Sequence, residues 1–291
     1  MSYTLSSAQD NSKLIYINSD DVTESLSTDG SVFSVQLENT IDSPDTEDLL
    51  VSLYSCVIPY SFYNIREGVN NRIYLRNLTG NGAPDVDTTI PAGNYTISSF
   101  GKKLQELLQG CSFTSGTYAV SYDRIVMKYR IYAIGISNSE VSIDTSVYST
   151  TSPNVELGFL KNEVKVITLG VEATPLDSEY TTNCPDVNGS VHQIQVRTNL
   201  SSKGCYDSIT KSYSTILGSI PIDVNFGGII FQQPRDNKHK ILISTHKIDR
   251  ITIRLTDDKG RSLNLNGLTF QVAIQVDSVE KKHRIQPMDR I

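Results

Sequence analysis

Hydrophobic and polar residues alternate most regularly towards the end of the sequence. In residues 251–256 isoleucine and leucine alternate with threonine and arginine, and in residues 268–276 five apolar side chains share one face of an extended chain. The turn sequence Asp257-Asp258-Lys259-Gly260 follows the first run. A period of two predicts strands with one buried face and one wet face, and so an antiparallel sheet.

Shorter runs of the same kind predict strands along the rest of the chain. They cover residues 13–18, 31–37, 49–58, 117–122, 124–133, 140–143, 164–169, 191–198, 227–232 and 240–244. Two packed sheets are the usual way to cover so many half-wet strands. Because no linker rich in Pro, Gly and Ser divides the chain, we expect one all-β domain with long loops over residues 1–291.

One segment has helical spacing instead. Its apolar positions fall on one face, and they are Ile97, Phe100, Leu104, Leu107 and Leu108. Thr96 or Ser98 can cap the start, and Gly110 follows the last turn. The spacing predicts an amphipathic helix near residues 97–109 that packs on the sandwich, with Phe100 and Leu104 buried and Lys102 and Lys103 exposed.

The two ends of the sequence differ from the rest. Residues 1–12 are polar and lack a period, which predicts an arm that is ordered only when something holds it. Residues 280–291 form a short basic tail on an acidic chain, suited to solubility or to docking on an acidic partner. No run of about 20 apolar residues occurs, so no direct membrane insertion is expected. The N-terminus also lacks the pattern of a secretion signal.

Charge and cysteine content narrow the function further. The net charge is -6, from 26 basic and 32 acidic residues, which argues against a protein that coats nucleic acid. We therefore expect no specific nucleic-acid partner. The four cysteines, Cys56, Cys111, Cys184 and Cys205, lie far apart, and free thiols are expected. The sequence leaves open whether Cys184 and Cys205 pair.

Sequence signatures of catalysis are missing. There is no HExxH, no Gly-x-Ser-x-Gly and no phosphate loop, and the four histidines (His192, His239, His246 and His283) do not fall at metal-ligand spacing. We predict no catalytic residue, no cofactor and no metal, and hence a protein that is not an enzyme. A β-sandwich hydrolase would need two carboxylates converging in a cleft, and no spacing supports that alternative.

Four short stretches, taken in order, resemble a known family. They are 57–65 (VIPYSFYNI), 90–97 (IPAGNYTI), 156–159 (ELGF) and 253–260 (IRLTDDKG), the last continuing to 265–268 (LNGL). The chain resembles the penton, or minor capsid, proteins of virophages, polinton-like viruses and related eukaryotic double-stranded DNA viruses. The resemblance covers residues 45–110 and 245–278 well and the middle of the chain poorly.

The resemblance implies a single jelly roll, with eight core strands in two facing sheets. It also implies a homopentamer at the fivefold vertices of an icosahedral capsid, in contact with double-jelly-roll trimers of the major capsid protein and with other minor capsid proteins. Such a subunit is made in the host cytoplasm or viral factory and ends in the virion. Residues 145–217 are long for a minimal jelly roll, so elaborated loops or an inserted subdomain are expected there.

A receptor- or carbohydrate-binding β-sandwich module of a viral fibre or surface protein is the alternative. Its expected mark is an exposed aromatic platform on one sheet. The chain has 15 tyrosines, but the absence of tryptophan counts against this reading. Tyr54, Tyr60 and Tyr63, near a strand end, suit either an interface or half-buried sheet positions.

Overall fold

The computed structural model describes residues 12–27, 29–78, 82–111, 117–134, 141–168, 170, 175–188, 191–232 and 240–281. The chain divides into two compact units, one of Met1–Phe62 with Val191–Ile291 and the other of Tyr63–Ser190. One domain over residues 1–291 was expected, with elaborated loops or an inserted subdomain within residues 145–217. The second unit begins well before residue 145, where that insertion was expected to begin. Among the described residues, no helix has the length and apolar character needed to cross a membrane.

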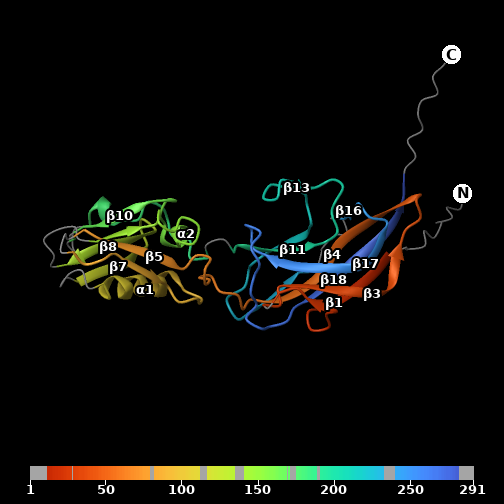
Figure 1. Ribbon diagram of the computed structural model, residues 1–291, viewed down its shortest axis with the longest axis horizontal. Helices are drawn as coiled ribbons and strands as arrows, with labels where there is room; N and C mark the ends of the chain where they lie inside the picture. Colours follow the sequence, from red (N-terminus) through yellow and green to blue (C-terminus); the bar gives the residue numbers. More distant parts are fainter. Residues whose placement is uncertain are drawn as a thin grey trace, which may run out of the picture. The chain divides into compact units, whose positions relative to one another are not determined.

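Two antiparallel sheets form the first unit (Figure 1). In one sheet the order is β1 (Ser12–Asn18), β18 (Gln271–Glu280), β4 (Glu47–Pro59) and β15 (Ile229–Gln232), and β16 (Ile241–Leu242) also pairs with β4. In the other the order is β14 (Ile216–Pro221), β11 (Gln193–Thr198), β17 (Lys247–Thr256), β3 (Val32–Asp42) and β2 (Glu24–Ser25). We call them the first and the second sheet.

The strand order is that of a jelly roll. Eight of the described strands form the jelly roll. In chain order they are β1, β3, β4, β11, β14, β15, β17 and β18. The first sheet combines the first, eighth, third and sixth of them, and the second sheet the second, seventh, fourth and fifth. Two Greek keys on eight strands give this arrangement. The predicted all-β jelly-roll sandwich is therefore confirmed.

The period-two residues of the sequence form the core between the sheets. Ile251, Ile253 and Leu255 are fully buried, whereas Arg254 between them is exposed. Phe33 of β3 packs against Phe270, with ring centroids 5.4 Å apart. Burial of alternate residues fixes the register, because a slip by one residue would turn every apolar side chain outward.

The second unit has its own sheet, hairpin and core. Its sheet has the order β10 (Val164–Ile167), β9 (Val141–Asp144), β5 (Arg72–Asn77) and β6 (Val86–Thr89). A hairpin of β7 (Thr117–Asp123) and β8 (Lys128–Ile134), the helices α1 (Ile97–Gln109) and α2 (Asn154–Leu157) and a 3-10 turn at Asp177–Glu179 complete it. A separate cluster of buried apolar residues lies within this unit, which explains why it forms a body of its own.

Helix α1 spans residues 97–109 as predicted. The Thr96 hydroxyl accepts from the Ser99 backbone N–H, and Phe100 and Leu104 are fully buried. Lys102 is exposed as predicted, whereas Lys103 is half-buried and pairs with Glu106 at 2.9 Å. The apolar stripe packs against β7 of the second unit. The expectation that it packs on the sandwich is therefore wrong, since the helix belongs to the insertion.

The family-like stretches have definite structural roles. Asn64 donates from Nδ2 to the Tyr95 carbonyl at 2.8 Å and accepts from the Tyr95 backbone N–H at 3.0 Å. This pair holds the segments 57–65 and 90–97 together. In residues 156–159, Gly158 has φ +77, and a Cβ there would lie 2.3 Å from the Asn183 carbonyl oxygen. Only glycine fits both the left-handed backbone and the close approach.

Candidate interaction surfaces

Histidine and cysteine side chains are the candidates for metal binding in the sequence. No group of three or more His, Cys, Asp or Glu side chains in the described residues could hold a metal ion. All four cysteines are free, including Cys184 and Cys205. His192 is exposed and lies 3.4 Å from an Asp258 oxygen, while His239 and His283 fall outside the described residues. Exposed surfaces are the candidate functional features of the described residues.

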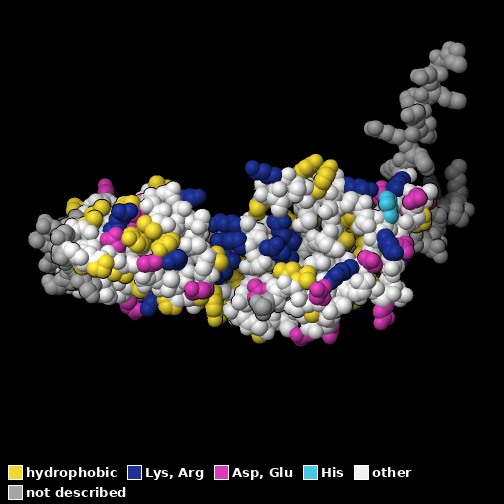
Figure 2. Space-filling view, viewed as in Figure 1, with side chains coloured by type: hydrophobic (Ala, Val, Ile, Leu, Met, Phe, Trp, Pro, Cys, Tyr) yellow, Lys and Arg dark blue, Asp and Glu magenta, His cyan; other side chains and the backbone are white. Residues whose placement is uncertain are grey.

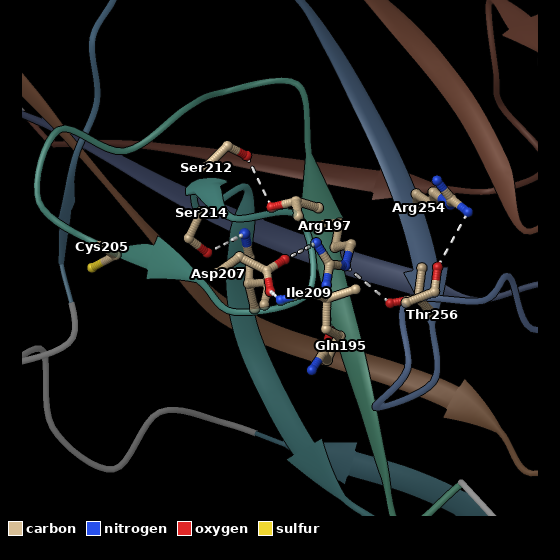
Figure 3. A network of polar contacts seen from close by, with 12 residues as sticks. Gln195, Arg197, Cys205, Asp207, Ile209, Ser212, Ser214, Arg254 and Thr256 are labelled. Carbon is tan, nitrogen blue, oxygen red and sulfur yellow. Dashed lines mark hydrogen bonds and ion pairs between the residues drawn. The ribbon is translucent and has the colours of Figure 1, made fainter.

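A buried arginine organises one of them, on the outer face of the second sheet. Arg197 of β11 donates from Nη1 to Asp207 Oδ2 at 2.7 Å and from Nη2 to Gln195 Oε1 at 2.8 Å (Figure 3). Its Nε donates to Thr256 Oγ1 at 3.1 Å. The side chains of Arg197 and Asp207 are only 9% and 4% exposed. A buried charge is costly unless it is paired and hydrogen-bonded, so these three contacts together offset the desolvation cost of Arg197 and Asp207.

The ion pair attaches a hairpin to this face. Asp207 lies on β12 (Tyr206–Asp207), which pairs with β13 (Ser212–Tyr213). Its other carboxylate oxygen accepts from the Ile209 backbone N–H at 2.9 Å. The Ser214 backbone N–H donates to the Cys205 carbonyl at 2.7 Å and closes the base of the hairpin. The hairpin therefore has fixed contacts at its base and at the sheet.

Asp207 makes the attachment sensitive to acid. Its pKa lies below the ordinary value, first because the Ile209 N–H donates to it and then because Arg197 does, although burial opposes the shift. A lowered folded-state pKa gives stability that is present above about pH 4 and lost as the pH falls through the folded value. We expect the difference in urea midpoint between wild type and Asp207→Asn to shrink from pH 7 to pH 3. A constant difference would contradict this linkage.

The hairpin presents two tyrosines to solvent. Tyr206 and Tyr213 are cross-strand partners with ring centroids 4.7 Å apart and a 30° tilt. They are 72% and 49% exposed, and Figure 2 shows hydrophobic side chains gathered over this hairpin. Folding leaves these rings largely in water, so they are available to a partner. The polar stretch 200–217 gave no sequence signal for them beyond the two tyrosines themselves.

The first sheet has apolar side chains on its outer side and at its edges. On the edge strand β15, Ile229 and Phe231 are 63% and 62% exposed. On the opposite edge strand β1, Tyr16 is 75% exposed and borders a hollow of about 380 Å³ that also includes Ser55 and Ala273. An exposed apolar edge strand favours association with another chain.

Other residues singled out from the sequence lie elsewhere. Tyr60 is buried, with its ring 4.6 Å from that of Phe62, and Tyr54 and Tyr63 are half-buried. The three tyrosines therefore occupy buried or half-buried positions, as expected for residues of a sheet and not for an exposed interface. The predicted arm lies outside the described residues up to residue 11, as does the tail from residue 282.

Comparison with solved structures gives 25 matching chains. The chain resembles a penton protein. The crystal structure of selenomethionine-labelled mavirus penton protein matches it with a TM-score of 0.48 and 13% sequence identity, over 92% of this chain and 100% of that chain. No protein-family model and no curated protein matches the sequence.

Proposed function

We propose that the chain is a penton, a minor capsid subunit that closes the fivefold vertices of an icosahedral capsid by self-association. The observation that carries the proposal is that a jelly-roll fold and the penton-like sequence motifs occur in the same chain. The first unit has jelly-roll strand order, and the family-like segment 57–65 leads from the end of β4 into the inserted unit. A jelly roll alone hosts many functions, so the motifs carry the specific part. The proposed role is structural and uses no cofactor or metal.

Two edges of the first unit support the proposed ring. In a cyclic pentamer each subunit contributes two different surfaces, because the contacts are heterologous. The edge strands β15 and β1 lie at opposite sides of the first sheet, and each exposes large apolar side chains. Copies of the chain could bury one edge against the other. The proposed neighbours in the shell are trimers of a double-jelly-roll major capsid protein.

Electron cryomicroscopy of particles containing the chain tests this proposal. We expect density for the chain at the fivefold vertices in wild-type particles. Phe231→Glu is expected to reduce the share of occupied vertices, because a charge on β15 opposes burial of that edge. Arg254→Glu, a change at an exposed position on the second sheet, serves as the control. Density only at positions away from the fivefold axes would overturn the proposal, as would a stable twofold dimer as the assembled form.

A receptor- or carbohydrate-binding module remains the second candidate, and the Tyr206–Tyr213 pair favours it. Exposed aromatic rings on a fixed hairpin suit stacking against an apolar ligand face. Titration of the purified chain with soluble oligosaccharides distinguishes the two candidates. Binding that Tyr206→Ala removes and Tyr16→Ala preserves would support the second function.

A further inference from the structure

The tip of the β7–β8 hairpin carries three consecutive exposed apolar residues. Asp123 pairs with Lys128 across the hairpin, and residues 124–127 form the turn between them. Ile125 is 93% exposed, Val126 44% and Met127 55%. Folding gains little from apolar side chains left in water, so their presence at one tip calls for another explanation.

Turn chemistry does not supply that explanation. Met127 has φ +56, a left-handed conformation in which glycine or asparagine is favoured over methionine. Polar or small residues would form this turn at lower cost. The three apolar side chains are therefore unfavourable in water at this tip, and Met127 is also unfavourable for its backbone conformation.

The tip is nevertheless held in place. Asp123 accepts from the Ile125 backbone N–H at 2.8 Å and from the Val126 N–H at 3.4 Å. Its other oxygen accepts from the Tyr180 hydroxyl at 2.8 Å. Lys128 donates from Nζ to the Thr182 carbonyl at 2.8 Å. These contacts present the apolar side chains on a supported turn, which reduces the entropy lost when they bind.

Charge and residue type indicate the kind of surface that the tip fits. Arg124 and Lys128 flank the apolar residues, and the Asp123 carboxylate is engaged by two backbone amides and a tyrosine. Protein interfaces favour aromatic residues, methionine and arginine and are depleted in lysine. This tip has Arg124 and Met127 but no aromatic residue, and a lysine follows it, so the two flanking cations decide between the surfaces. Aliphatic side chains next to cations instead suit the boundary between acyl chains and anionic headgroups.

We propose that residues 125–127 insert into the interfacial layer of a lipid bilayer containing anionic lipid, with Arg124 and Lys128 at the headgroups. The inference goes beyond the structural role in a capsid and does not require it. It departs from the expectation of no direct membrane insertion, because that expectation weighed only spans of about 20 residues. A three-residue tip is too short for that criterion to detect.

The absence of tryptophan from the chain provides a clean reporter. Val126→Trp places a single tryptophan at the tip, and Tyr206→Trp places one at an exposed site in the other unit. With vesicles of phosphatidylcholine and phosphatidylserine at millimolar lipid, we expect the emission of the tip reporter to shift to the blue. Brominated lipid should quench it. The Tyr206→Trp reporter should not respond.

Two further changes in the Val126→Trp background test the role of the neighbouring side chain. Ile125→Asp is expected to lower partitioning by about tenfold, the scale of keeping one aliphatic side chain in water. Leu160→Asp makes the same charge change at an exposed leucine of the same unit, 53% exposed, and should leave partitioning unchanged. Pure phosphatidylcholine vesicles should bind more weakly than the anionic ones.

Several outcomes would overturn the proposal. They are an unchanged emission of the tip reporter at millimolar lipid, equal losses from Ile125→Asp and Leu160→Asp, and an equal response of the Tyr206 reporter. If Ile125→Asp instead alters the sedimentation of the chain without lipid, the tip binds protein and the lipid assignment fails. None of these results depends on whether the chain occupies a capsid vertex.

Discussion

Replacing Arg197 with alanine is expected to destabilise the jelly-roll unit by about 3–5 kcal/mol. The change leaves the Asp207 carboxylate, only 4% exposed, without the guanidinium that lies 2.7 Å from it. It also removes the contacts to Gln195 and Thr256. A buried charge that loses its partner keeps its desolvation cost, which is why removing one member costs more than the pair contributes.

The control uses the cross-strand neighbour of Arg197. Arg254 lies opposite Arg197 in the β11–β17 register but is exposed, so Arg254→Ala should cost less than about 1 kcal/mol. The double variant Arg197→Met with Asp207→Leu should cost less than Arg197→Ala, because no unpaired charge remains. Urea unfolding followed by hydrogen exchange over residues 191–232 measures all three. Equal losses at Arg197 and Arg254 would contradict the ion-pair argument.

Replacing Leu104 with alanine is expected to destabilise the inserted unit by about 2–5 kcal/mol. Leu104 of helix α1 is fully buried in the apolar core of the inserted unit, and the smaller side chain leaves a cavity. Lys102→Ala on the exposed face of the same helix should change stability by less than about 0.5 kcal/mol. Hydrogen exchange of residues 97–109 in increasing urea gives the measurement.

The two substitutions also test the division of the chain. Because each unit has its own core, Leu104→Ala should lower protection chiefly in residues 63–188, and Arg197→Ala chiefly in the jelly roll. A uniform loss of protection across the chain after either change would show that the units unfold together.

Long periodic segments were predictable from the sequence, whereas short strands and an apolar turn were not. Strands β17 and β18 and helix α1 have enough residues for a period to show. Strands β5, β6 and β14 were missed, since four to six residues of mixed polarity give no clear period. The tip residues 125–127 were assigned to a strand, because an apolar run is normally taken as part of a strand and not as its turn.

The boundaries of the insertion could not be located either. A domain boundary is usually marked by a change in composition, and the sequence Tyr60-Ser61-Phe62-Tyr63 shows none. Residues at this boundary make specific contacts instead. The Ser61 hydroxyl donates to the Leu265 carbonyl at 2.6 Å, and Asn64, next to the stretch, donates to the Tyr95 carbonyl. The Arg197 network was equally hidden, because Thr256 comes to it by pairing of β17 with β11 and Asp207 by the docking of a separate hairpin.

The position of the insertion affects how the protein is made. During synthesis β1, β3 and β4 leave the ribosome first, but their partners β17 and β18 follow only after the whole insertion. Ser12 must find Asp277, and Asp42 must find Lys247. The inserted unit can fold in the meantime. Its folding reduces the conformational entropy that is lost when the early strands pair with β17 and β18 across this long segment. Until β18 emerges to lie between β1 and β4, the early strands are unsatisfied edges, and a chaperone that shields them would raise the yield of folded protein.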